Sequence, residues 1–197
     1  MPFTNLKGIT ILYGEEGTGK SIICLELAKD ELNKNNKVLY LDTENNFSIE
    51  RFKQILKDNE KFSNIFILKL KNIREQQDQI KNLYYLIKKF NPSLIIIDTI
   101  CSHYKRLYKH KSDLAKAMLY SQLKILKEIS NSIPIIITSQ VYEDFSTKQT
   151  KMIAEKILTK FSDKIIKLQK NPRRIITEMP DKKINSFEIN SNGIIFI

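Results

Sequence analysis

Residues 14–21 read Gly14-Glu15-Glu16-Gly17-Thr18-Gly19-Lys20-Ser21 and match the pattern G-x-x-x-x-G-K-[ST] in full. Glycines suit such a loop because its backbone must fold around a polyphosphate with the N–H groups pointing inward, which requires positive φ and little side-chain bulk. In this pattern Lys20 contacts the β- and γ-phosphates, and the hydroxyl of Ser21 is a ligand for Mg²⁺. The stretch therefore predicts a phosphate-binding loop, with nucleotide contacts at Gly14, Glu15, Glu16, Gly17, Thr18, Gly19, Lys20, Ser21 and Ile22.

The segments on either side of the loop fit this interpretation. Residues 9–13 are apolar enough for a short buried strand, and residues 22–32 have the pattern of a helix. The N-terminus of that helix would add partial positive charge and free N–H groups to the phosphate site. A glycine-rich turn that matches the pattern by chance is the alternative, and the order of strand, loop and helix disfavours it.

Composition favours one cytoplasmic domain without a membrane segment. The chain has 197 residues and no Pro-, Gly- or Ser-rich linker that would divide it. No apolar run approaches the ~18 residues of a membrane span. Cys24 and Cys101 have neither paired nor metal-ligand spacing, so we interpret them as core thiols in a reducing compartment.

The charge balance points to a polyanionic partner. The chain carries 33 lysines and arginines against 22 aspartates and glutamates, a net charge of +11. Such an excess attracts nucleic acids, although a lysine-rich composition can also reflect genome bias or solubility.

Three further apolar segments end in polar side chains. Residues 38–41 precede Asp42-Thr43-Glu44, residues 94–97 precede Asp98, and residues 133–138 precede Ser139-Gln140. In an open α/β sheet the carboxyl ends of the strands form the ligand-binding edge. Four apolar residues followed by an acid have the Walker B form, in which the aspartate holds Mg²⁺, so Asp98 joins Ser21 as a candidate metal ligand. An aspartate that only caps the next turn is the alternative.

The remaining pattern predicts helices first and antiparallel strands last. Helices are expected after Ser48, over residues 73–90 and over residues 112–129, the last with an inward face formed by Leu114, Met118, Ile125 and Ile129. An irregular polar stretch at 143–151 and a short helix near 152–161 come next. Strands are then expected at 164–168, 174–177, 186–189 and 194–197, with a hairpin signal at Asn192-Gly193.

The expected fold class is therefore α/β. It has a mainly parallel twisted sheet with helices on both faces and C-terminal antiparallel strands.

Four motifs together resemble the RecA/RadA recombinase core, which is a P-loop NTPase. They are residues 14–21, 40–44, 94–104 and 138–142. Within that superfamily the chain is similar to the archaeal RadB family, over most of its length and less closely after Val141. The resemblance implies one RecA-like ATP-binding domain over residues 1–197, ATP and Mg²⁺ as cofactors, and single-stranded DNA and recombination or repair proteins as partners.

The resemblance also implies roles for individual residues. Glu44 matches the glutamate that orients or deprotonates the attacking water, a role that suits a carboxylate near the γ-phosphate. A solvated acid at the strand end is the alternative. Gln140 matches the glutamine that senses the γ-phosphate, and with Lys20 and Glu44 it completes the expected catalytic set. Arg51 matches an arginine near the adenine, although a helix-surface arginine that pairs with solvent or a glutamate fits equally well.

The stretch from His103 to Lys111 is the candidate DNA contact, in a loop where the first DNA-binding loop of the resembled family begins. It interleaves cations with aromatic side chains, and single-stranded nucleic-acid sites use cations for phosphates and aromatic rings for bases. A solvated loop with two tyrosines in the core is the alternative. The expected DNA-binding residues are Tyr104, Lys105, Arg106, Tyr108, Lys109 and Lys111.

Departures from the resembled family shape the functional expectation. Active RadA-type recombinases have an N-terminal DNA-binding domain and a Phe-x-x-Ala linker that do not occur in this sequence, and residues 178–183 replace an expected basic stretch. We expect an accessory protein of homologous recombination and repair with weak Mg²⁺-dependent ATPase activity and no strand exchange of its own. A KaiC-like signalling ATPase is an alternative that Asn45 after Glu44 disfavours, and a non-catalytic scaffold is another.

Overall fold

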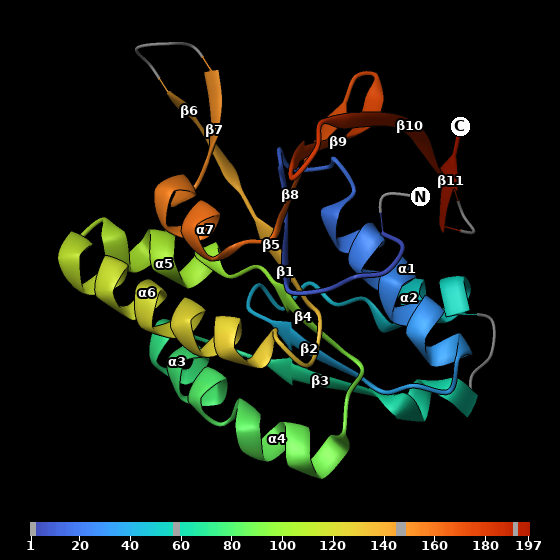
Figure 1. Ribbon diagram of the computed structural model, residues 1–197, viewed down its shortest axis with the longest axis horizontal. Helices are drawn as coiled ribbons and strands as arrows, with labels where there is room; N and C mark the ends of the chain where they lie inside the picture. Colours follow the sequence, from blue (N-terminus) through green and yellow to red (C-terminus); the bar gives the residue numbers. More distant parts are fainter. Residues whose placement is uncertain (1–2, 57–59, 145–148, 191–192) are drawn as a thin grey trace.

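The computed structural model describes residues 3–56, 60–144, 149–190 and 193–197, and its largest feature is one nine-stranded sheet (Figure 1). In order across the sheet the strands are β11 (Gly193–Phe196), β10 (Lys183–Asn190), β9 (Arg173–Met179), β8 (Lys164–Lys170), β1 (Ile9–Gly14), β5 (Ile135–Ser139), β4 (Leu94–Asp98), β2 (Val38–Asp42) and β3 (Ile65–Lys69). Strands β6 (Val141–Asp144) and β7 (Gln149–Met152) form a separate hairpin.

Six neighbouring strands of the sheet run parallel. These strands, β3, β2, β4, β5, β1 and β8, pair in parallel register, and β9, β10 and β11 continue the sheet antiparallel to one another. The expected α/β fold class with C-terminal antiparallel strands is confirmed.

Helices cover both faces of the sheet (Figure 1). They are α1 (Lys20–Asn33), α2 (Ile49–Leu56), α3 (Ile73–Lys81), α4 (Leu83–Phe90), α5 (Cys101–Tyr108), α6 (Ser112–Ile129) and α7 (Glu155–Phe161), with a 3-10 turn at Glu60–Asn64. Side chains alternate along each strand, so Ile95 and Ile97 of β4 pack with α3 to α7, whereas Ile96 packs with α1 and α2. Because both faces are covered, the central strands are apolar without alternation.

Two of the sequence-based helix predictions were wrong in detail. The helix expected over residues 73–90 is divided at Asn82 into α3 and α4. Ile80 and Leu83 are both fully buried, so the apolar pattern continues through the break, and the low helix propensity of asparagine is the only local signal of it.

The face of α6 that packs inward also differs from the prediction. Leu114 is exposed and Met118 is only half-buried, while the buried positions are Ala115, Leu119, Gln122, Leu123, Leu126 and Ile129. Of the four residues predicted to face inward, Ile129 is buried and Ile125 is partly buried against the core. The predicted face is displaced from the observed one, which also includes a small alanine and a glutamine. Gln122 is buried because its Oε1 accepts a hydrogen bond of 2.8 Å from Nε2 of Gln76 on α3.

The segment after β5 is more regular than expected. The stretch at 143–151 was predicted to be irregular, but β6 and β7 pair from Val141 with Met152 to Asp144 with Gln149. Helix α7 begins at Glu155, after Met152 has completed β7. Pairing of β10 with β11 confirms the last hairpin, although Asn192 of its turn lies outside the described residues.

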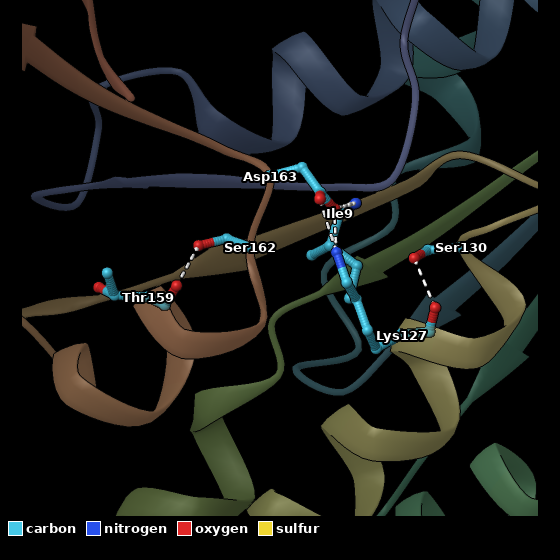
Figure 2. Close-up of polar contacts among 6 residues, drawn as sticks. All are labelled: Ile9, Lys127, Ser130, Thr159, Ser162 and Asp163. Atoms are coloured by element: carbon cyan, nitrogen blue, oxygen red, sulfur yellow. Dashed lines mark hydrogen bonds and ion pairs between the residues drawn. The ribbon is translucent and has the colours of Figure 1, made fainter. Parts of the chain in front are cut away.

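A cluster of polar contacts lies at the amino-terminal ends of the parallel strands (Figure 2). The glycine loop follows β1 at the opposite, carboxyl-terminal edge of the sheet. Asp163, just before β8, accepts a hydrogen bond of 2.8 Å from the backbone N–H of Ile9. The same carboxylate pairs at 2.6 Å with Nζ of Lys127 on α6. These contacts fix the start of β1 relative to β8 and α6. Within the described ranges, no helix is long and apolar enough to cross a membrane.

Candidate nucleotide-binding site

The glycine loop connects the end of β1 to the start of α1. Gly19 has a φ of +100°, and a Cβ there would lie 2.7 Å from the side chain of Ile189 on β10. A Cβ on Gly14 would lie 2.5 Å from the backbone oxygen of Leu168 on β8. Close approach of the C-terminal strands and positive φ thus favour glycine at these two positions of the motif.

Lys20 occupies the mouth of this loop. Its Nζ donates hydrogen bonds of 2.8 Å to the carbonyl of Gly14 and 2.7 Å to that of Glu15. Burial lowers the pKa of Lys20, and the carboxylates of Asp98 and Glu44 act in the opposite direction. The ammonium group is therefore held among carbonyls and carboxylates at the point where the motif requires a phosphate contact.

Asp98 lies at the carboxyl end of β4 and is held by two hydroxyl groups. Its Oδ2 accepts a hydrogen bond of 2.7 Å from Tyr40 of β2, and its Oδ1 accepts one of 2.5 Å from Thr138 of β5. Neighbouring strands thus orient a carboxylate that is only 9% exposed. Ser21, in the first turn of α1, lines the same cavity. A hydroxyl and a carboxylate are the hard oxygen ligands that Mg²⁺ prefers, so these residues fit that ion.

Glu44 follows β2 and Gln140 follows β5. Their side chains are in contact beyond the carboxyl end of β4, which lies between these two strands. Nε2 of Gln140 donates a hydrogen bond of 2.6 Å to Oε1 of Glu44. Burial, and then the charge of Asp98, raise the pKa of Glu44. Two of the residues assigned by resemblance are therefore in direct contact.

The turn that carries Glu44 is held by a buried aspartate. The carboxylate of Asp42 accepts backbone hydrogen bonds of 3.2 Å from Glu44, 3.2 Å from Asn46 and 2.9 Å from Phe47. Asp42 is 2% exposed, and these contacts give it a structural role in shaping the turn.

A cavity of about 550 Å³ joins these groups. It is lined by Gly14, Glu16, Gly17, Gly19, Lys20, Ser21, Ile22, Glu44, Asn46, Asp98, Thr99, Lys105, Gln140, Val141, Arg173 and Ile189. The catalytic, metal and most nucleotide candidates predicted from the sequence are thus together. Its volume is typical of a small-molecule or cofactor site.

Some predicted nucleotide contacts lie outside this lining. The side chain of Thr18 is buried and its Oγ1 donates a hydrogen bond of 2.8 Å to the carbonyl of Glu15, which stabilises the turn of the loop. Arg51 on α2 donates a hydrogen bond of 2.6 Å to the carbonyl of Asn190, at the end of β10. Arg51 is therefore next to the strand that supplies Ile189 to the cavity.

Sequence reasoning missed several lining residues. Thr99 and Val141 lie within the motifs at 94–104 and 138–142, and Asn46 lies two residues after the motif at 40–44. Their proximity to the strand ends was therefore an available signal. Arg173 and Ile189 come from β9 and β10, and no local pattern connects them to a loop about 150 residues earlier. Their presence depends on the pairing of β8 beside β1.

The candidate DNA segment is a helix rather than the predicted loop, at least as far as Tyr108. Cys101 and Tyr104 are buried at helical spacing against α6, which explains why α5 forms. Tyr104 is only 6% exposed, so its ring belongs to the core, as one of the two alternatives anticipated. His103 is also buried, and its Nε2 lies 2.8 Å from the carbonyl of Leu70.

The other candidates for DNA contact remain at the surface. They are Lys105, Arg106, Tyr108, Lys109 and Lys111. Between α5, the β6–β7 hairpin and the start of α7 lies a groove of about 680 Å³. Its lining includes Tyr104, Lys105, Tyr108, Lys116, Tyr142, Lys151 and Lys156. Lys105 lines both this groove and the nucleotide cavity, so the two sites adjoin.

Comparison with known proteins gives a consistent result. The sequence model of the Rad51 family matches residues 4–195. The DNA repair and recombination protein RadB of Methanocaldococcus jannaschii is 34% identical over 169 residues, which cover 82% of this chain and 78% of the relative. The protein of the same name from Methanobrevibacter smithii is 29% identical over 204 residues, covering 95% and 87%.

A solved structure agrees with this assignment. A crystal structure of the RadB recombinase matches with a TM-score of 0.80 and 29% sequence identity, and the match covers 96% of this chain and 91% of that one. The chain therefore belongs to the Rad51 family, and within that family it is similar to RadB.

Proposed function

We propose that residues 1–197 form one ATP-binding domain that acts as a DNA-binding accessory protein in homologous recombination and repair. Membership of the Rad51 family and the printed names of the relatives support the recombination role. The single observation that carries ATP binding is the convergence of Lys20, Ser21, Asp98 and Glu44 on one cavity at the carboxyl edge of the sheet. We place the protein in the cytoplasm, where single-stranded DNA and repair proteins would be its partners.

In the proposed reaction each residue has a distinct task. Lys20 and the loop amides bind the β- and γ-phosphates. Ser21 and Asp98 would hold Mg²⁺, which would neutralise phosphate charge when bound. Glu44 accepts a hydrogen bond from the attacking water and orients it. Gln140 holds the Glu44 carboxylate through the 2.6 Å bond and positions it relative to the loop. The oxygen of the attacking water forms a bond to the γ-phosphorus, and the bond between the γ-phosphorus and the oxygen that bridges it to the β-phosphate breaks. The products are ADP and inorganic phosphate, which carries the protons of the water.

We expect hydrolysis to be slow and strand exchange to be absent. With Gln140 bonded to Glu44, one oxygen of the carboxylate is occupied by an amide donor and is not free to accept a hydrogen bond from water. Single-stranded DNA would bind at the cationic and aromatic groove, with lysines on phosphates and Tyr108 and Tyr142 stacked on bases. Lys105, which lines both sites, is the direct connection between nucleotide and groove.

Two substitutions separate binding from turnover. Lys20→Ala should abolish ATP binding measured by calorimetry, because the loop loses its phosphate cation. Glu44→Ala should still bind ATP but lower the rate of phosphate release by about 10²-fold or more, as removal of a general base does. Lys37→Ala, at an exposed position before β2, is the control for removing a lysine. Unchanged turnover in Glu44→Ala would remove this glutamate from the mechanism.

A further inference from the structure

The tip of the β8–β9 hairpin lies against the phosphate loop. Lys170 at the end of β8 pairs with Glu15 of the loop at 3.1 Å, and Lys170 is directly opposite Arg173 in the hairpin register. Nη1 of Arg173 donates hydrogen bonds of 3.2 Å to the carbonyl of Gly17 and 3.5 Å to that of Thr18. The hairpin thus brings two cations to the loop, in addition to Lys20.

The contacts of Arg173 with the loop are weak for a guanidinium. Both are longer than the usual 2.9–3.0 Å for an N–H···O bond. Both also join a charged donor to a neutral carbonyl, whereas a guanidinium bound to phosphate oxygens makes bonds of about 2.7–2.9 Å that are roughly twice as strong. Arg173 lines the nucleotide cavity, so phosphate oxygens bound there would be better acceptors within its reach.

The charges of the residues that line the cavity also favour a contact between Arg173 and phosphate. Its acidic lining residues are Glu16, Glu44 and Asp98, and its basic lining residues are Lys20, Lys105 and Arg173. Without Arg173, the carboxylates in the cavity lining would outnumber the cations. A bound triphosphate would add further negative charge. The loop of this chain has glutamates at both positions after Gly14, and the second of them, Glu16, adds a negative charge to the cavity lining. A cation from outside the motif offsets that repulsion.

We propose that Arg173 binds the polyphosphate of the nucleotide and exchanges its bonds to the Gly17 and Thr18 carbonyls for bonds to phosphate oxygens. The β8–β9 hairpin is then part of the nucleotide site and is held differently in the free and bound states. The inference rests on the ATP binding proposed above. Arg174 provides a matched reference, because it is the next residue on β9, faces the other side of the sheet and is exposed.

Calorimetric titration with ATP and Mg²⁺ tests this role in the full chain. Arg173→Gln removes the charge and shortens the side chain, and we expect ATP affinity to fall about tenfold or more, as for the loss of a hydrogen bond to a charged group. Arg173→Lys keeps the charge and should stay within about threefold of the parent. Arg174→Gln should bind like the parent protein.

The possible outcomes distinguish failure of the role proposed for Arg173 from failure of the proposed ATP binding. If Arg173 does not contact the phosphates, Arg173→Gln will bind ATP as tightly as the parent, or Arg173→Lys will lose as much affinity as Arg173→Gln. Either result would overturn the inference and leave ATP binding intact. Equal losses in Arg173→Gln and Arg174→Gln would also overturn it, because the effect would then be one of general charge. No ATP binding by the parent protein would overturn the proposed function itself. Unchanged thermal unfolding of the nucleotide-free variants is the control for folding.

Discussion

The contact between Glu44 and Gln140 shows how single residues act together in this site. They are 96 positions apart in the sequence, yet the amide and the carboxylate are 2.6 Å apart. Asp42 fixes the turn that carries Glu44, and Tyr40 and Thr138 fix Asp98 beside it. The geometry of the proposed reaction therefore depends on structural residues as well as on those that would touch the nucleotide.

The raised pKa of Glu44 makes its charge a cost to folding. A carboxyl group whose pKa is higher in the folded state contributes stability below its unfolded pKa and loses that contribution as pH rises through the folded pKa. At pH 7 the charged form therefore opposes folding. Glu44→Gln removes the charge and keeps an amide to meet Gln140, so we expect a higher Tm at pH 7, by about 2–4 °C for each kcal/mol gained.

Thermal unfolding at two pH values checks this prediction. At pH 4 the parent is largely protonated at Glu44, so the gain from Glu44→Gln should shrink there. Glu50→Gln, at an exposed position of α2, is the control and should change Tm little at either pH. A lower Tm for Glu44→Gln at pH 7, or the same gain at both pH values, would contradict the assigned cause of the shift.

At this scale the sequence predicted the residues that belong to local motifs. Lys20 and Asp98 each follow a buried strand within a few residues, so the direction of the chain was sufficient to place them at the carboxyl edge of the sheet. Arg173 and Ile189 could not be predicted in the same way. They reach the cavity through pairing of β8 with β1 and of β9 with β8, which no local pattern encodes.

At the scale of single elements, α5 changes which residues can contact DNA. The interleaved cations and tyrosines are typical of a loop in composition, but their spacing also fits a helix. The structure instead buries Cys101 and Tyr104 on one face of a helix and leaves Tyr108 exposed near the groove. Because the segment is helical, Tyr104 packs in the core, whereas Tyr108 is exposed beside the groove.

Substitution of the two tyrosines should have opposite consequences. Tyr104→Ala removes a core ring and should destabilise the protein by about 3–5 kcal/mol in urea unfolding. Tyr108→Ala should change stability little but weaken binding of an oligo-dT strand by about 1–3 kcal/mol, the range for loss of a stacked base. Fluorescence anisotropy measures the binding. Tyr85→Ala, at an exposed position on α4, is the control, and equal loss of affinity in Tyr85→Ala and Tyr108→Ala would argue against a site in the groove.

For the whole molecule, the fold class followed from the sequence but the arrangement of the sheet did not. Apolar strands that alternate with helices predicted parallel pairing, and the short final segments predicted antiparallel pairing. The order β8-β1-β5-β4-β2-β3 depends on pairings between distant segments, and it is this order that places β1, β4, β2 and β5 ends around one cavity. It also puts the β8–β9 hairpin next to the phosphate loop.

The arrangement of cavity and groove is the basis on which we propose that nucleotide and DNA binding are coupled. Lys105 lines both, and Val141, which follows Gln140, lines the cavity at the base of the β6–β7 hairpin. If a bound phosphate moved the side chain of Gln140 or Lys105 toward the cavity, the positions of the residues that line the groove would therefore change. With a net charge of +11, the molecule also has the long-range attraction for DNA that such a switch would modulate.

The measurement that tests this coupling most directly is fluorescence anisotropy of a labelled single-stranded oligo-dT. It is made with and without ATP and Mg²⁺, across a series of salt concentrations. We expect tighter binding with ATP and Mg²⁺, and a linear fall of log K with log salt whose slope is about 0.7 per neutralised phosphate. Absence of binding at low salt, or an affinity that ATP and Mg²⁺ leave unchanged, would contradict a nucleotide-controlled DNA-binding function.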